Sequence, residues 1–166
     1  MPPLDSHKPT VLLVDDDVAV LTLCRTLLEQ EGFSVLVATG SSVALNICKN
    51  YPGSIDVLLT DLVLPPPEFS FSCGANEFPH VHGHQLAVRA LGMRKTLRII
   101  LMSGNLDKIL ADYGIRRGSV PLISKPFENQ TLINLVRGTL RERPTSQESL
   151  VKEPAAQAQG PDAWFG

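Results

Sequence analysis

The sequence predicts an α/β fold in which a five-stranded parallel sheet is covered by helices on both faces. Two observations support this fold class. Five short apolar runs alternate strictly with segments whose apolar residues recur at helical spacing. The runs around Leu12, Leu58 and Ile100 are also almost entirely aliphatic, which is typical of strands that helices bury on both sides. Strict strand-helix alternation implies right-handed crossovers and therefore parallel strands.

The apolar runs give the expected strands. The three most aliphatic runs should be central in the sheet. Pro121 cannot donate a ladder hydrogen bond, so it places the last run at an edge. The five runs are Thr10 to Val14, Ser34 to Ala38, Ile55 to Thr60, Arg98 to Met102 and Val120 to Ser124.

The segments between the runs give five expected helices, of which the first has the clearest limits. Asp17 can cap its start and Gly32 can end it. The second helix begins at Ser41 or Ser42, and the third begins at about His84. The apolar residues that should face the sheet in the last three helices are Leu86, Ala87, Ala90 and Leu91; Leu106, Ile109, Leu110 and Tyr113; and Leu132, Leu135, Val136, Thr139 and Leu140.

Breaks in this pattern divide the chain into parts. Residues 10–143 are expected to form one domain, and residues 1–9 precede it as an N-terminal extension. Residues 66–82 are too long for an ordinary strand-to-helix loop, so we interpret them as an insertion. Residues 144–166 have too little apolar content to pack, and we expect a disordered C-terminal tail.

Composition excludes several classes of protein. The 15 basic and 17 acidic residues leave no basic excess to hold a polyanion, so direct binding of nucleic acid is not expected. The three cysteines are odd in number, which argues against a disulfide framework. No apolar run has the length of a signal peptide core or a membrane span. We therefore expect a soluble, cytoplasmic protein with no membrane partner.

Polar residues stand at the carboxyl ends of four expected strands. The first run ends in Asp15 and Asp16, the third in Asp61, the fourth in Ser103 and the fifth in Lys125. Ligands of open α/β sheets bind outside the carboxyl ends of the strands, where strand order reverses. Three carboxylates, a hydroxyl and an amine should therefore converge on one crevice.

The chemistry of this crevice favours a metal ion and a phosphoryl group. Crowded carboxylates repel one another unless a cation lies among them, and hard oxygen ligands suit Mg²⁺. Mg²⁺ held by few carboxylates completes its shell with water and phosphate oxygens, and a carboxylate beside such a group can form an acyl phosphate. Taken alone, the run Asp15 to Asp17 could instead serve as a helix cap, and one of the three should do so.

Four segments, LLVDDD, LLTDLVLP, IILMSGN and LISKPF, stand in this order at the expected strand ends. Together they resemble the signature of response-regulator receiver domains over about Thr10 to Arg141. The resemblance implies a CheY-like, flavodoxin-like fold with strand order 2-1-3-4-5, which agrees with Pro121 at an edge. It also implies two-component signalling, in which a sensor histidine kinase donates a phosphoryl group to an aspartate.

The resemblance assigns the acidic residues by position. Asp61 corresponds to the phosphoacceptor. Asp15 and Asp16 correspond to the acidic pair that binds Mg²⁺, and Asp61 and the main-chain carbonyl of Val63 complete the protein ligands.

Two further residues are assigned on the neighbouring strands. Ser103 matches the hydroxyl that bonds the phosphoryl group, and Lys125 matches the amine that pairs with it. Pro126 matches a proline that follows a cis peptide bond in this family.

The sequence departs from the family pattern at four positions. Leu122 stands where the family often has an aromatic switch residue. Val63 and Asn105 border the expected path of an attacking water, and the apolar Val63 should slow loss of the phosphoryl group. The glycine that usually follows the acceptor closely occurs only at Gly83, after the insertion.

The resemblance therefore predicts a stand-alone, phosphorylatable regulatory domain with slow autophosphatase activity rather than an enzyme. Its partners would be a sensor histidine kinase or phosphotransfer protein and a downstream protein target. Phosphorylation would shift a two-state surface formed by the fourth helix, the fifth strand and the fifth helix. A homodimer through this surface is one arrangement that the resemblance allows.

Two other functions compete with this prediction. An Mg²⁺-dependent phosphohydrolase could use Asp61 as a turnover nucleophile, although it would need a substrate pocket and a second acid-base group. A receiver-like docking module that is no longer phosphorylated is the other alternative, and the intact acidic pair, acceptor and lysine argue against it.

The insertion and the residues just after it contain side chains with more than one interpretation. His80, His82 and His84, with Cys73 nearby, could bind zinc, but the spacing lacks a second ligand pair and favours histidines on a surface loop. A second set consists of Phe69, Phe71 and Phe78, which either anchor the loop on the domain or contact a partner.

Overall fold

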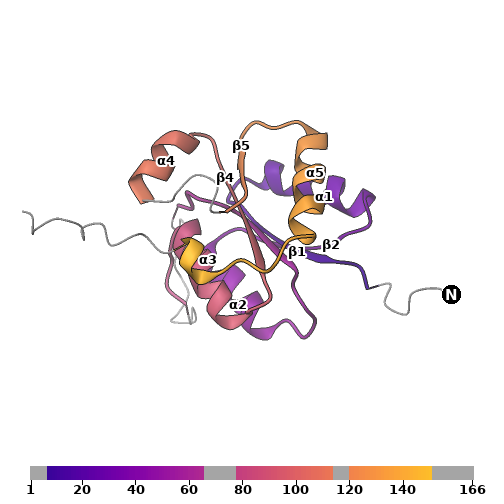
Figure 1. Ribbon diagram of the computed structural model, residues 1–166, viewed down its shortest axis with the longest axis horizontal. Coiled ribbons are helices and arrows are strands. Elements are labelled where there is room, and N and C mark those ends of the chain that lie inside the picture. The colour runs from indigo at the N-terminus through magenta and orange to yellow at the C-terminus, as the bar shows by residue number, and fades with distance from the viewer. Residues whose placement is uncertain (1–6, 66–77, 114–119, 151–166) are drawn as a thin grey trace, which may run out of the picture.

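The computed structural model describes residues 7–65, 78–113 and 120–150, and they form a five-stranded parallel sheet between helices (Figure 1). The strand order β2-β1-β3-β4-β5 confirms the predicted fold class. The strands are β1 Thr10–Val14, β2 Ser34–Ala38, β3 Val57–Asp61, β4 Arg98–Ser103 and β5 Leu122–Ser124. The helices are α1 Val18–Gln30, α2 Ser41–Asn50, α3 Gly83–Met93, α4 Leu106–Tyr113, α5 Asn129–Leu140 and α6 Gln147–Leu150.

The sheet separates two hydrophobic cores because successive side chains of a strand point to opposite faces. On one face, Leu12 and Val14 of β1 pack with α2 and α3. On the other face, Val11 and Leu13 pack with α1 and α5. Both faces of β1 are fully buried, which explains why its sequence is aliphatic throughout.

Strand β5 is the shortest and lies at the edge of the sheet, as Pro121 predicted. It begins at Leu122, two residues later than expected. Pro121 accepts a hydrogen bond from the Leu101 N–H at 3.0 Å but has no N–H of its own to extend the ladder. The first half of β4 is therefore left without β5 as a neighbour.

The limits of α1 follow from the residues predicted to set them. The Asp17 side chain accepts a hydrogen bond from the Ala19 N–H at the start of the helix. Gly32 has a φ of 94° just beyond its end, a conformation that costs glycine little. Helix α3 begins at Gly83, one residue before the expected His84. The four apolar side chains expected to face the sheet from α4 lie outside the described residues.

The C-terminal residues 144–150 correct the expectation of a tail that is disordered from residue 144. Thr145 accepts a hydrogen bond from the Ile99 N–H on its hydroxyl at 2.9 Å and donates its own N–H to the Leu97 carbonyl at 3.1 Å. These bonds fill the part of β4 that β5 leaves unpaired. Helix α6 follows, and Leu150 is only 1% exposed within the α2–α3 core. We call residues 144–150 the C-terminal strap; residues 151–166 lie outside the described part.

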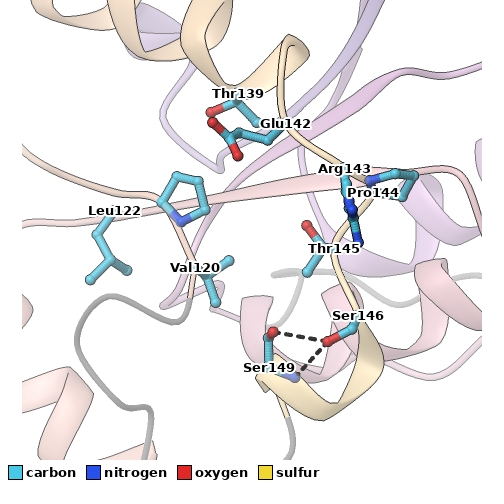
Figure 2. Close-up of a pocket in the computed structure, with 10 residues that line it drawn as sticks. Val120, Leu122, Thr139, Glu142, Arg143, Pro144, Thr145, Ser146 and Ser149 are labelled. Carbon is cyan, nitrogen blue, oxygen red and sulfur yellow. Dashed lines mark hydrogen bonds between the residues drawn. The ribbon is translucent and has the colours of Figure 1, made fainter.

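A hollow of about 680 Å³ lies beside the C-terminal strap. Figure 2 shows Thr139 of α5 and Glu142, just beyond that helix, on one side, and Ser146 and Ser149 of the strap on the other. The start of the β5 segment, including Leu122, borders it as well. Its lining includes none of the polar residues that end the strands, so it is separate from the predicted site.

Two further expectations concern cysteines and membranes. Cys24 and Cys48 are free and buried, and burial raises the pKa of each thiol to about 11, so both stay protonated at neutral pH. Cys73 lies outside the described residues. Within the described chain, every helix is too short or too polar to cross a membrane.

Candidate functional site

Three carboxylates gather where β1 and β3 end. The two strands are neighbours with Val14 opposite Thr60, so the residues that follow, Asp15 and Asp61, lie side by side. Carboxylate oxygens of Asp15, Asp16 and Asp61 all lie within 4.8 Å of one another. Asp15 is fully buried, Asp61 is nearly so, and Asp16 is exposed. The cluster thus has a buried floor and one side open to solvent.

Lys125 brings a positive charge to this cluster from the end of β5. Its Nζ lies 2.7 Å from Asp15 Oδ2 and 2.9 Å from Asp61 Oδ2. The backbone N–H of Lys125 donates to the Ser103 carbonyl at 2.9 Å, and this bond aligns the ends of β4 and β5. The peptide bond between Lys125 and Pro126 is cis, as expected. One ammonium pairs with two of the three carboxylates, so the cluster keeps a net negative charge.

The burial of these groups shifts their proton affinities. Burial raises the pKa of Asp61, and the hydrogen bonds from Lys125 and from the Val63 N–H only partly oppose this. Burial alone would lower the pKa of Lys125, but its hydrogen bonds to Asp15 and Asp61 raise it overall. Lys125 therefore stays protonated at neutral pH as the permanent cation of the site.

Asp17, the third acid of the run, is not part of the cluster. Its carboxylate caps α1, and its own N–H donates to Asp15 Oδ1 at 2.9 Å. The expectation that one acid of the run serves as a cap is therefore met by Asp17. The same bond orients Asp15, because it holds one carboxylate oxygen while the other faces Lys125.

The loop after β3 is held against the cluster. The Val63 N–H donates to Asp61 Oδ1 at 3.1 Å, and the Leu62 N–H donates to the Met102 carbonyl at 2.9 Å. The Val63 side chain is 44% exposed beside the acceptor position. Leu64 is fully buried and anchors the end of this loop in the core.

Gly83 packs directly on the acceptor strand. A Cβ at this position would lie 2.0 Å from the Asp61 carbonyl oxygen, so only glycine fits without a backbone shift. The Gly83 N–H donates to the Leu62 carbonyl at 3.0 Å. Gly83 comes 22 residues after Asp61 in the sequence, yet it lies against the Asp61 backbone. The insertion therefore leaves this packing intact.

Two histidines next to Gly83 contact the same loop, which the sequence interpretation did not predict. His82 Nδ1 accepts a hydrogen bond from the Leu64 N–H at 3.1 Å. Burial, and to a lesser extent the electrostatic effect of His82, lowers the pKa of His80. A hydrogen bond with the Leu64 backbone acts in the opposite direction. The two rings meet edge to face with centroids 5.4 Å apart. Their alternate spacing could have suggested that both lie on one side of an extended segment.

The zinc interpretation of these histidines finds no support in the described part of the chain. There, the acidic trio is the one group of histidine, cysteine or acidic side chains whose ligand atoms converge. His84 points elsewhere and its Nε2 contacts the Leu150 carbonyl in the C-terminal strap. Of the three phenylalanines, Phe78 packs against the core as an anchor would, and the other two lie outside the described residues.

Ser103 borders the cluster, and its hydroxyl oxygen accepts a hydrogen bond from the Asn105 N–H at 3.1 Å. It is almost completely buried at the end of β4, next to Lys125 through the backbone. Leu122 lies partly buried against the core beneath this end of the sheet. Among the described residues, the predicted side chains from β1, β3, β4 and β5 thus reach one end of the sheet.

The donor set of the cluster fits a small hard cation. It offers carboxylate oxygens from three residues, one of them accessible to solvent, and it carries excess negative charge. Mg²⁺ prefers this chemistry and normally keeps several water ligands, which the open side permits.

Comparison with known proteins places these motifs in a family context. Residues 11–68 match the family model of the response regulator receiver domain. The transcriptional regulatory protein CpxR of Escherichia coli K12 is 30% identical over 138 residues, which cover 83% of this chain and 52% of CpxR. CpxR of Klebsiella pneumoniae is 31% identical over 144 residues, with 86% and 54% covered. The chain thus spans about half the length of these curated relatives.

Solved structures agree with the fold. A CheY-like receiver domain protein from Methanospirillum hungatei JF-1 superposes with a TM-score of 0.63 at 23% sequence identity, covering 86% of this chain and 98% of that one. At this identity the similarity concerns the fold, which is the five-stranded arrangement described above.

Proposed function

The chain carries a receiver domain of the response-regulator family of two-component systems, and from this premise we propose that Asp61 accepts a phosphoryl group from a sensor histidine kinase or phosphotransfer protein in an Mg²⁺-dependent step. The observation that carries the proposal is the placement of Asp61 Oδ2. This oxygen lies 2.9 Å from Lys125 Nζ, within a cluster of acids that opens to solvent.

Asp15, Asp16, Asp61 and the main-chain carbonyl of Val63 would hold the ion. When bound, Mg²⁺ would neutralise the carboxylates and the charge that develops on the transferring phosphoryl oxygens. Support for this assignment comes from the three carboxylates, whose hard oxygen donors lie within 4.8 Å of one another.

Asp61 would act as the nucleophile. Its carboxylate oxygen forms a bond to phosphorus while the bond from phosphorus to the donor nitrogen breaks, and the electron pair of that bond remains on the nitrogen. Lys125 offsets the charge of the incoming group because its ammonium is already held at Asp61. The Ser103 hydroxyl would turn from its contact with Asn105 and donate to a phosphoryl oxygen.

The acyl phosphate should be long-lived. Val63 presents an exposed apolar side chain two residues beyond Asp61, where a polar side chain would orient an attacking water. We expect a half-life of the purified phosphoprotein in Mg²⁺ well beyond seconds. A half-life of only seconds would contradict this role of Val63.

The output would be a change in protein contacts rather than a chemical product, which is consistent with a regulatory family. The surface formed by α4, β5 and α5 is where we place that change, because Ser103 and Lys125 stand at the ends of β4 and β5. A downstream protein, or a second copy of this chain, would read it.

The test is incubation with acetyl phosphate and Mg²⁺, followed by intact-mass measurement. We expect the parent protein to gain one phosphoryl group and Asp61→Asn to gain none. Asp56→Asn is the matched control, since Asp56 caps Thr10 at the other end of β3 and its variant should still be labelled. An unlabelled parent without phosphomonoester turnover would leave only the docking-module alternative, and sustained phosphomonoester turnover would favour the hydrolase.

A further inference from the structure

The insertion returns to the domain through a segment that is fixed at several points. On the α2 side, the Ser42 hydroxyl donates to the Phe78 carbonyl at 2.6 Å, and Ser41 Oγ accepts from the Val81 N–H at 2.8 Å. On the β3 side, His82 and Gly83 contact the loop that follows Asp61. Residues 78–83 therefore link the start of α2 to the acceptor loop.

His82 contacts a particular peptide group of that loop. The N–H that it accepts belongs to Leu64, and the same peptide unit carries the carbonyl of Val63. This peptide bond is trans, because in the described residues the cis bond is that before Pro126. In a trans peptide the N–H and the C=O point in opposite directions. A bond that fixes the Leu64 N–H thus fixes the direction of the Val63 carbonyl.

The ring of His82 is itself held in place. It is the residue before the first turn of α3, and its own carbonyl accepts from the Leu86 N–H at 2.9 Å. The rings of His80 and His82 pack edge to face, and His80 Nε2 is buried without a hydrogen-bond partner in the described structure. Gly83, the next residue, packs closely against the Asp61 backbone. The imidazole therefore has little freedom to leave Leu64.

We infer that His82 is a positioning residue for the metal site: it orients and polarises the Val63–Leu64 peptide so that the Val63 carbonyl can serve as an Mg²⁺ ligand. This inference rests on the proposed function of the acidic cluster. An acceptor on the N–H increases the negative charge on the carbonyl oxygen of the same amide. Removing a group that hydrogen-bonds to a metal ligand typically weakens metal affinity by about 10- to 100-fold.

The test compares Mg²⁺ affinity in two variants of equal size. In His82→Asn the side-chain oxygen is as many bonds from Cα as Nδ1 and can accept the Leu64 N–H, whereas His82→Leu has the same shape and no acceptor. Calorimetric titration with Mg²⁺ alone should give a dissociation constant about tenfold higher for His82→Leu. The value for His82→Asn should stay within about threefold of the parent.

His84→Leu is the matched control, because His84 Nε2 contacts the Leu150 carbonyl in the C-terminal strap. Its Mg²⁺ affinity should stay within about twofold of the parent, even if its stability falls. Thermal unfolding without Mg²⁺ separates stability from affinity in every variant. Equal Mg²⁺ affinity of the parent and His82→Leu, or equal losses in His82→Asn and His82→Leu, would overturn the inference.

A measurement on the parent decides the case if His82→Leu does not fold. Nitrogen-15 spectra of the imidazoles should show His82 with the proton on Nε2 and none on Nδ1, and a proton on Nδ1 would overturn the inference. Failure of the proposed function can be distinguished from failure of the role of His82. If the parent binds no Mg²⁺ and gains no label, the metal site and the role of His82 fall together. If the parent binds Mg²⁺ and His82→Leu binds it equally well, only the role of His82 falls.

Discussion

The two ends of the sheet handle charge in opposite ways. At the carboxyl end, the carboxylates of Asp15, Asp16 and Asp61 crowd together, and one ammonium pairs with two of them. At the amino end, polar groups meet one by one with complementary partners: Asp56 accepts from the Thr10 N–H at 2.8 Å, and Arg98 donates to the Glu142 carbonyl at 2.9 Å. The carboxyl end thus keeps repulsion that the amino end avoids. Such repulsion fits the proposed cation site, because crowded charges in a cleft are usually functional.

The largest expected effect breaks the balance at the carboxyl end. Lys125→Met removes the cation that faces two buried carboxylates, so the free energy of unfolding without Mg²⁺ should fall by about 3 kcal/mol, measured by denaturant titration. Adding Mg²⁺ should restore part of this loss.

Lys108→Met provides the matched control for this change. Lys108 also pairs with an aspartate, Asp112, at 3.1 Å, but both side chains are largely exposed. The control should lose less than about 0.5 kcal/mol. If both lysine variants were equally stable, the burial of the carboxyl-end cluster would not distinguish the two pairs.

An intermediate effect is expected where the C-terminal strap, which starts at the amino end, completes the α2–α3 core. Leu150→Ala should lower the free energy of unfolding by about 2 kcal/mol because it leaves a cavity against the α2–α3 core. Leu23→Ala on the exposed face of α1 should cost less than about 0.5 kcal/mol in the same denaturant titration. Equal, small losses in both would mean that the strap contributes little to the fold.

The smallest effect has the opposite sign and sharpens the comparison. Asp16→Asn removes one of the repelling charges, so without Mg²⁺ it should raise the free energy of unfolding by about 0.5 kcal/mol. Asp17→Asn, one residue along, should leave stability nearly unchanged because asparagine caps helices as well as aspartate does. Thermal unfolding with EDTA measures both, and a destabilised Asp16→Asn would argue against net repulsion at this end.

Local patterns were enough to predict most of the fold. Strands β1 and β2 have the predicted limits, and Asp17 and Gly32 bound α1 as expected, because these signals depend on neighbouring residues alone. The convergence of Asp15, Asp61 and Lys125 was predictable for a related reason. In a parallel sheet the carboxyl ends of adjacent strands meet, whatever the intervening helices contain.

The C-terminal strap was not predictable from composition. Its sequence is polar, and it is held by one buried leucine and by backbone bonds through Thr145 that need the unpaired half of β4. That half is free only because β5 is short. The contact of His82 with Leu64 was hidden for a similar reason, since it joins residues 18 positions apart across the insertion.

The stems of the insertion have a practical consequence. A hydrogen bond joins the Leu64 N–H to the His82 ring. The length of the chain between these two residues therefore need not alter the acceptor loop. Extending a loop whose ends are already fixed costs little, roughly 0.6 kcal/mol for each doubling of its length. The segment is therefore a natural place to graft an epitope or a reporter domain while leaving the scaffold of the acidic pocket undisturbed.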